Sequence, residues 1–278
     1  MRENSEAACQ DKVFLHKMSW VEVKQVAREN TVAIIPTGSI EQHGPHLPLA
    51  TDSYIGYELC KRLEQKLAGK LPFIITPPAV FGASSHHLDF PGTLSLNINT
   101  YIALMQDLCN CLVHHGFKRI LLLNSHGGNI APLNVVIRNI RDQHRIIIAT
   151  ATYWVVASEE IARIRESGPG GIAHAGELET SCMLIIKPEL VKEDLFENKV
   201  PTWKTDYILL DLQGEGKVSL AQHLSDFTPT GVIGNPLLAS RKKGQKFLEA
   251  ATNSLADFIV EFATWKLGAM VNNDEEKG

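Results

Sequence analysis

The sequence predicts an α/β fold in which helices cover both faces of a mostly parallel β-sheet. Short apolar runs of strand length alternate with longer segments whose apolar residues recur at helical spacing. The short runs are apolar throughout, which is typical of parallel strands buried on both faces. With 278 residues, 44% of them hydrophobic and 21% charged, the chain is long enough to bury one sizeable core. We therefore expect a three-layer α/β/α architecture in a single domain over residues 13–270.

The expected elements alternate between helix and strand along the chain. The first helix opens with Ser19 and has Glu22 three residues later, which is the pattern of a capping box. Gly116 is placed to end a later helix. The expected helices are residues 19–30, 54–67, 99–116, 130–144 and a long one within 235–265. The expected strands are residues 31–36, 71–77, 118–124 and 145–154.

Three parts of the chain differ from this alternation. Residues 1–12 and 271–278 are polar and charged, and we expect them to be flexible tails. Residues 196–226 break the pattern on either side of them. We expect this segment to leave the core and to supply a lid over a site or a contact between subunits.

Composition excludes several classes of partner. The net charge of −4 and the pI near 6.3 provide no overall positive field, so neither nucleic acid nor an acidic membrane is an expected partner. The sequence has no apolar run of twenty residues, and its first residues are polar where a secretory signal would be apolar. The five cysteines show no framework spacing. We expect a cytoplasmic protein with free thiols.

Side chains with metal-ligand chemistry follow several of the expected strands. In open α/β sheets, ligands bind beyond the carboxyl ends of the strands. The stretch PTGSIEQHGPHLPLATD (residues 36–52) follows the first strand, SHGGN follows the third, and HAGELETS follows a later connection. The candidate residues in these stretches are Glu41, His43, His46, Asp52, His126, His174, Glu177 and Glu179. A single histidine beside a turn is usually structural, so it is their joint occurrence that favours a site.

The spacing within these stretches has physical reasons. Glu41 and His43 are two residues apart, so in an extended segment their side chains point the same way. Asp52 stands where a helix should start, and it is suited either to cap that helix or to bind a metal. Gly127 and Gly128 allow the backbone to pass close to whatever His126 binds. The set is sufficient for two metals that share a bridging carboxylate, although one metal held by three ligands would also be competent.

Other motifs lead to weaker or negative predictions. His86 and His87 follow the second strand at the same edge of the sheet, and whether they line the pocket is left open. The stretch GPGGIA (168–173) fits a dinucleotide-binding pattern but follows no strand, which argues against nucleotide binding. Ser125 lacks the G-x-S-x-G context of a serine hydrolase. Nitrogen and oxygen ligands without cysteine favour zinc, manganese or iron.

Four motifs in order, GSIEQHGPHLPLATD, NSHGGN, HAGELETS and TPTGVIGNP, resemble the creatininase (creatinine amidohydrolase) family over about residues 30–240. The resemblance implies a three-layer α/β fold, two divalent metal ions, and a homohexamer built as a trimer of dimers. Zinc is the first choice of metal, with manganese or iron as alternatives. By this resemblance, Glu41, His43, Asp52 and His126 match metal ligands, Asp52 is the bridge, and Glu179 is the fifth ligand.

Two departures separate the chain from creatininase proper. Gly128 stands where creatininases have a glutamate, and GPGGIAHAG lacks the tryptophan that precedes the histidine matching His174. Whether Trp154 replaces that aromatic wall is open. The HGGN form resembles the wider family more closely, whose members include a formylamide hydrolase, a peptidase that trims a redox-cofactor precursor, and a hydrolase of an oxidised inositol.

The expected function is that of a metal-dependent amidohydrolase acting on a small molecule. A metal-activated water would attack a C–N bond other than a peptide bond, with a cyclic amide as the expected substrate. His174 would give a proton to the leaving nitrogen, and Glu177 is the second candidate for proton transfer. Two alternatives remain open at this point. One is a hydrolase of another bond, such as a carbon–carbon bond of a cyclic ketone, a peptide or a formamide, and the other is a non-catalytic metal-binding assembly subunit.

Overall fold

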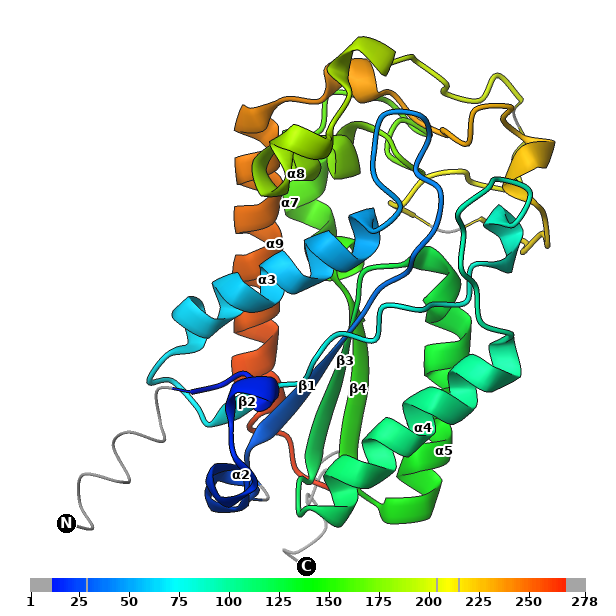
Figure 1. The fold of residues 1–278 in the computed structure, drawn as a ribbon. Helices are drawn as coiled ribbons and strands as arrows, with labels where there is room; N and C mark the ends of the chain where they lie inside the picture. Colours follow the sequence, from blue (N-terminus) through cyan, green and yellow to red (C-terminus); the bar gives the residue numbers. More distant parts are fainter. Residues whose placement is uncertain (1–11, 29, 204, 215, 269–278) are drawn as a thin grey trace, which may run out of the picture.

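The computed structural model of the chain describes residues 12–28, 30–203, 205–214 and 216–268. These residues contain a four-stranded sheet in the order β2-β1-β3-β4, and all of its strand pairs are parallel. The predicted α/β fold with a mostly parallel sheet is confirmed (Figure 1). The strands are β1 (Val32–Thr37), β2 (Phe73–Ile75), β3 (Arg119–Asn124) and β4 (Ile147–Thr152).

The long predicted helices are also present. The α-helices are α2 (Trp20–Val26), α3 (Thr51–Leu67), α4 (Ile98–His114), α5 (Ile130–His144), α6 (Tyr153–Val156), α7 (Ser158–Ile164), α8 (Glu177–Ile186) and α9 (Arg241–Phe262). The capping box of α2 is formed, because Ser19 Oγ accepts from Glu22 N at 3.4 Å and Glu22 Oε2 accepts from Ser19 N at 2.6 Å. Several boundaries were predicted wrongly. The helix α2 ends at Val26 instead of residue 30, α3 begins three residues early, at Thr51, and β2 covers only Phe73–Ile75 of the expected 71–77. Tyr153 and Trp154 were expected to end the fourth strand, but they begin α6.

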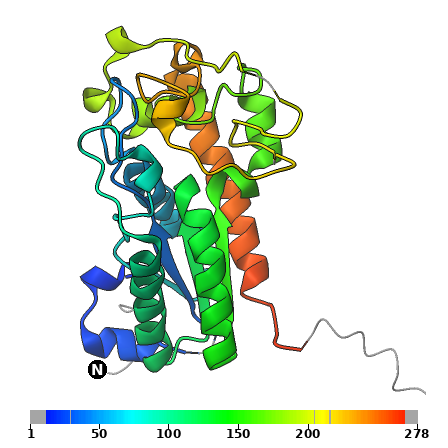
Figure 2. The ribbon, with the colours of Figure 1, turned by 90° about the vertical axis from the view of Figure 1, so that its right-hand side faces the viewer.

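The sheet separates two apolar cores, which explains why its strands are apolar throughout. Val32 and Ile34 of β1 pack in the core formed with α3, α8 and α9, whereas Ala33 and Ile35 belong to the core on the α4 and α5 side. Figures 1 and 2 show α3 and α9 on one face of the sheet and α4 and α5 on the other. Alternate residues of a strand point to opposite faces, so a strand covered on both sides must be apolar at every position.

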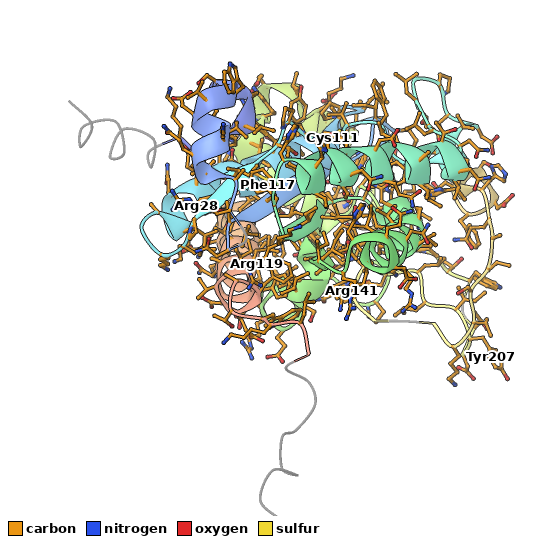
Figure 3. The ribbon with its side chains drawn as sticks, turned by 90° about the horizontal axis from the view of Figure 1, so that it is seen from below. Arg28, Cys111, Phe117, Arg119, Arg141 and Tyr207 are labelled. Carbon is orange, nitrogen blue, oxygen red and sulfur yellow. The ribbon has the colours of Figure 1, made fainter. Side chains whose placement is uncertain are left out.

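The two edges of the sheet differ in character. At the edge where the strands begin, seen from below in Figure 3, Arg119 donates to the carbonyl oxygens of Trp265 at 2.7 Å and Phe262 at 3.4 Å, which fixes the chain after α9. Phe117, at the same edge, is fully buried. At the opposite edge, buried polar side chains follow β1 and β3.

The segment 196–226 was predicted to leave the core, and the described residues of 197–226 do so: they cross above the carboxyl ends of the strands (yellow in Figure 1). Its described residues contain one short 3-10 helix, Leu224–Asp226. The predicted tails lie outside the described residues apart from Lys12, whose Nζ pairs with Glu22 Oε1 at 2.8 Å. Cys60, Cys109, Cys111 and Cys182 are free. Within the described ranges, no helix is long and apolar enough to cross a membrane.

Candidate metal centre

The chain brings the predicted metal-ligand side chains together at the carboxyl edge of the sheet. Glu41 and His43 lie in the connection after β1, Asp52 in the first turn of α3, His126 directly after β3, and Glu179 in the first turn of α8. Each of these five residues is at most 5% exposed. Five ionisable side chains buried together need compensating charges or hydrogen bonds to be stable.

Asp52 lies between two of the histidines. Its Oδ1 is 3.2 Å from Nε2 of His43, and its Oδ2 is 3.0 Å from Nδ1 of His126. Oε2 of Glu41 is 3.1 Å from the same nitrogen of His126. Asp52 does not cap α3, because Ala50 occupies the N-cap position. Its two oxygens therefore face two different groups of potential ligands.

These distances fit the placement of ligand atoms around metal ions. Two donor atoms bound to one ion at roughly 2.0–2.2 Å lie about 3.3–3.6 Å apart in tetrahedral geometry, slightly more than the 3.0–3.2 Å between these atoms. Glu41 Oε2 and Asp52 Oδ2 are buried and share His126 Nδ1 as a neighbour, at 3.1 and 3.0 Å, and one N–H cannot fully satisfy two carboxylate oxygens. Three groups have potential ligand atoms within 4.8 Å of one another: Glu41–Asp52–His126, His43–His174–Glu179 and Glu41–His87–His174. The two incompletely satisfied carboxylate oxygens and the mixed nitrogen and oxygen donors fit a centre for divalent cations.

Backbone and hydroxyl groups fix the orientation of the imidazoles. Nδ1–H of His43 donates to the carbonyl of Glu41 at 3.1 Å, so Nε2 is the nitrogen available to a metal. Nε2 of His126 lies 3.1 Å from Ser84 Oγ, which leaves Nδ1 facing the carboxylates. Such contacts to the second nitrogen of a ligand imidazole set its tautomer and ring orientation.

The electrostatics of the group also indicate that positive charge belongs there. Burial lowers the pKa of His43, but the attraction of Asp52 outweighs it and raises this pKa to about 10. Burial likewise lowers the pKa of His126, but Glu41 and Asp52 raise it well above its usual range. Burial raises the pKa of Glu41, but His126 and His87 lower it well below its usual range. In the metal-free protein, two imidazolium groups therefore balance the carboxylates.

Glu179 and His174 have the opposite shifts. Burial raises the pKa of Glu179 to about 7 against the attraction of His43. Burial and the repulsion of His43 lower the pKa of His174 to about 3. His174 Nε2–H donates to the carbonyl of Gln42 at 2.8 Å, and Nδ1 lies 3.9 Å from Glu41 Oε1. His174 is thus a neutral imidazole beside the carboxylates, with one nitrogen held by the backbone.

The structure does not bring Glu177 to this group. Its Oε1 accepts from Lys243 Nζ at 2.7 Å and from Glu166 N at 2.9 Å, and its Oε2 accepts from Ser167 N at 2.8 Å. Burial raises the pKa of Glu177, but the bond from Lys243 and the other donors outweigh it and lower this pKa. Residues two apart on a helix lie on different faces, so Glu177 anchors the turn before α8 whereas Glu179 faces the candidate ligands.

His46 also lies outside the group. Its Nε2 is 3.0 Å from Thr180 Oγ1. Burial lowers the pKa of His46 to about 4. His46 therefore fixes the first stretch against α8 instead of facing Asp52.

Three further residues, His87, Gln42 and His86, contact the group of candidate ligands. His87 Nε2 lies 3.3 Å from Glu41 Oε1, and its Nδ1 accepts from Gln42 Nε2 at 2.9 Å. The sequence did not decide whether His87 lines the pocket. It gave no indication that Gln42 takes part in the site, beyond its place between Glu41 and His43. The ring of His86 stacks on His126, with 5.8 Å between centroids and 16° between the planes.

Gly128 explains one departure from creatininase proper. A Cβ at this position would lie 2.2 Å from the carbonyl oxygen of Ala83, 2.5 Å from His126 Nε2 and 2.8 Å from His86 Cε1. Contacts that short do not occur, so no glutamate fits here without a shift of the backbone. The ring of His86 occupies part of the space beside this glycine.

A cavity of about 220 Å³ opens on the candidate ligands. The residues at its polar end include Glu41, Asp52, His126, His174 and Glu179, and His86 and His87 also line it. Its apolar lining residues are Trp154, Ala173, Leu209, Leu210, Leu212, Leu224 and Ile233. Trp154 thus supplies an aromatic side chain to this pocket, and the segment 197–226 contributes its cover.

The amino-acid sequence is similar to known proteins of one family. The family model described as "Creatininase: Creatinine amidohydrolase" matches residues 16–259. A mycofactocin precursor peptide peptidase of Mycobacterium ulcerans (strain Agy99) is 29% identical over 242 residues, which are 84% of this chain and 86% of the relative. A creatinine amidohydrolase of Pseudomonas putida is 28% identical over 269 residues, which are 90% of this chain and 96% of the relative.

Solved structures agree with these similarities. A structure described as "Creatininase Mn" superposes with a TM-score of 0.76 at 26% identity, covering 91% of this chain and 100% of that chain. A mutant creatininase described as of the Zn-Zn type has the same TM-score and identity, with 91% of this chain and 99% of that chain covered. Manganese and zinc are thus both associated with this fold.

Proposed function

The chain belongs to the creatininase family, whose model matches residues 16–259, and we propose that it hydrolyses a C–N bond of a small amide at a two-metal centre. It is a metal-dependent hydrolase of that family. The observation that carries the finer proposal is the position of Asp52, with one oxygen toward His43 and the other toward His126. This is the arrangement expected of a carboxylate that bridges two ions.

Two sets of side chains would hold the ions. Glu41 Oε2, Asp52 Oδ2 and His126 Nδ1 would form the first set, and His43 Nε2, Asp52 Oδ1 and a carboxylate oxygen of Glu179 the second. Divalent ions bound there would supply an activated water as nucleophile and a Lewis acid for the carbonyl. Zinc is our first choice, with manganese or iron as alternatives.

His174 is the residue that we assign to proton transfer. Burial and His43 lower its pKa to about 3, so it is neutral at pH 7. Its role in proton transfer rests on geometry, because Nδ1 is the nitrogen that faces the carboxylates, 3.9 Å from Glu41 Oε1. The hydrogen bond from Nε2–H to the carbonyl of Gln42 holds the ring in this tautomer. The imidazolium that forms then gives its proton to the leaving nitrogen. Glu177 remains the second candidate from the sequence, but its bonds to Lys243 and the backbone support an anchoring role.

The size of the cavity favours a small substrate. At about 220 Å³ it is smaller than the roughly 300–1,000 Å³ of most ligand pockets, which supports a compact amide over an extended peptide. The similarity to a peptide peptidase makes a peptide bond the second candidate. Water attack on either bond gives a carboxylic acid and an amine.

A hydrolysis assay in ¹⁸O-labelled water tests the proposal. Metal-loaded protein would be incubated with cyclic amides, formamides and short peptides of similar size, and the carboxylate product would be analysed by mass spectrometry. We expect one labelled oxygen in the product of a small non-peptide amide. His174→Ala should abolish turnover while metal remains bound, and His144→Ala, at an exposed position on α5, is the matched control. Full activity of His174→Ala would remove its role, and turnover of peptides alone would favour the second candidate.

A further inference from the structure

The segment 197–226 contributes four leucines to the wall of the cavity, together with Asp211 and Gln222. Leu209, Leu210, Leu212 and Leu224 line the cavity from this segment. Tyr207, from the same segment, is 59% exposed and lies at the periphery of the molecule (Figure 3). The four leucines thus contact the cavity, although Leu209 is 38% exposed, and Tyr207 does not line it.

Charged groups that could bind a charged substrate are missing from this wall. Among the described residues that line the cavity there is no lysine and no arginine. The one carboxylate on this side, Asp211, is fully occupied: it accepts from Arg165 Nη1 and Nη2 at 2.9 Å each, from Gly170 N at 2.6 Å and from Gln213 N at 2.9 Å. A charged substituent placed here would lose its hydration without gaining a partner.

One neutral polar group of the segment faces this region. Gln222 lines the cavity, and its Oε1 is buried without a hydrogen-bond partner among the described residues. An amide oxygen accepts hydrogen bonds, so it suits an N–H group of a bound molecule. An unpaired acceptor of this kind favours an uncharged amide over a carboxylate.

The wall is fixed relative to the metal ligands. The side chain of Asp211 is 1% exposed and that of Arg165 11% exposed, and their two parallel hydrogen bonds form a bidentate pair. Nε of Arg165 also donates to the carbonyl of Ser167 at 2.9 Å, and the backbone of Ser167 donates to Glu177 of α8. Because α8 also carries Glu179, one network connects the leucine wall to the metal-ligand group.

We propose that this leucine wall selects substrates whose reacting amide carries an uncharged apolar substituent. The inference rests on the proposed function, because the metal ligands fix where the reacting end lies. The reacting carbonyl faces Asp52 and His126, and the substituent extends toward Leu210 and Leu212. Apolar contact at the leucines contributes to binding, whereas a charge there opposes it.

Binding of three hydroxamates tests this inference without requiring turnover. Acetohydroxamate, 4-methylpentanohydroxamate and succinyl monohydroxamate share a metal-binding head, and the last two have tails of the same shape, one apolar and one anionic. Affinities would be measured by calorimetry on metal-loaded protein. We expect 4-methylpentanohydroxamate to bind about tenfold more tightly than acetohydroxamate, and the anionic compound no more tightly than acetohydroxamate.

Variants of the wall sharpen the test. Leu210→Lys should reverse the order of the apolar and anionic tails, and Leu209→Lys, at a more exposed position, gives the same test if the first variant does not fold. Leu220→Lys is the matched control, because Leu220 lies in the same segment, is 51% exposed and does not line the cavity. An unchanged order in both wall variants would contradict the role of the leucines.

The outcomes separate this inference from the proposed function. If acetohydroxamate binds to the wild type but not to Glu41→Ala, and the tails make no difference, the metal centre stands and the leucine wall has no such role. If no metal binds, the proposed function fails. The wall is then tested by ligand-observed NMR with 4-methylpentanamide and succinamate, which need no metal, and equal or absent binding of the two would overturn the inference.

Discussion

Asp52 lies in the first turn of α3, where an aspartate commonly caps a helix or interacts with its dipole. Its carboxylate instead faces His43 and His126. The sequence predicts that Asp52 stands at the start of a helix, but it does not decide between capping and metal binding. That choice depends on His43 and His126, whose positions are set by the fold. Glu177 and Glu179 show the same limit, since both stand in one motif and only the direction of α8 separates them.

The two glycines after His126 provide a residue-level prediction with an internal control. A Cβ at Gly128 would lie 2.2 Å from the carbonyl oxygen of Ala83, whereas a Cβ at Gly127 meets nothing within 4 Å. We expect Gly128→Ala to lower the free energy of unfolding by about 1–3 kcal/mol and to reduce the bound metal. Gly127→Ala should change both quantities far less. Equal urea denaturation midpoints and equal metal content in the two variants would contradict this account.

Metal binding should release protons near neutral pH. The pKa of His43 is raised to about 10 and that of His126 lies well above its usual range, so both imidazoles are protonated in the metal-free protein at pH 7. Because a metal ligand must be deprotonated, the ion displaces these protons, and metal affinity falls as the pH falls. Calorimetry with Zn²⁺ in two buffers of different ionisation enthalpy measures the number released. Metal binding without proton release at pH 7 would contradict the protonated state of the two histidines in the metal-free protein.

At the level of elements, apolar periodicity predicts the long helices and the buried strands, because the local sequence determines them. The bounds of α5, Ile130–His144, match the predicted range, and β1, β3 and α4 are shifted by at most two residues. The helices α6, α7 and α8 were not predicted, because they are short or buried nearly all round and have weak helical periodicity. His126 was predicted correctly to lie at the sheet edge, because it follows β3 directly.

The anchoring of α8 provides a prediction at this scale. Glu177→Gln removes the nearer of two carboxylates that pair with Lys243, which keeps Glu166 Oε1 at 3.1 Å. We expect it to lower the free energy of unfolding by about 2 kcal/mol at pH 7. The folded pKa of Glu177 lies below its usual value. Its contribution is therefore present above the unfolded pKa and is lost as the pH falls through the folded pKa.

Chemical denaturation between pH 7 and pH 3 measures this effect. The difference in stability between wild type and Glu177→Gln should shrink as the pH is lowered through this range. Glu249→Gln, at an exposed position on α9, is the matched control and should have little effect at either pH. A difference that is small at pH 7, or that grows on acidification, would show that Glu177 does not act through its charge.

At the level of the whole molecule, the parallel sheet places the ends of β1 and β3 beside one another, and this brings together side chains that are far apart in the sequence. The position of the centre was therefore predictable from the order of the elements. The cover formed by Leu209, Leu210 and Leu212 was not predictable from the sequence. The segment 197–226 has no regular apolar pattern, and its position depends on the ion pair between Asp211 and Arg165.

The homohexamer implied by the family resemblance stays a prediction at this scale. Large apolar side chains are exposed on α4, among them Leu104 at 37% and Leu108 at 38%, and in the segment 197–226, where Trp203 is 50% exposed. Such surfaces favour contacts between copies of the chain. Light scattering coupled to size exclusion should give six times the chain mass of 30.7 kDa. A monomer at micromolar concentration would contradict the prediction.

Metal content per chain tests the central claim most directly. Protein purified without added metal would be analysed by elemental analysis as wild type and as Glu41→Ala, Asp52→Asn and His126→Ala, with Asp107→Asn at an exposed position of α4 as control. The account predicts close to two divalent ions per chain in wild type and control, and a loss in each of the other variants, largest for Asp52→Asn. Folded wild-type protein that holds no metal, even after incubation with zinc, manganese or iron, would contradict it.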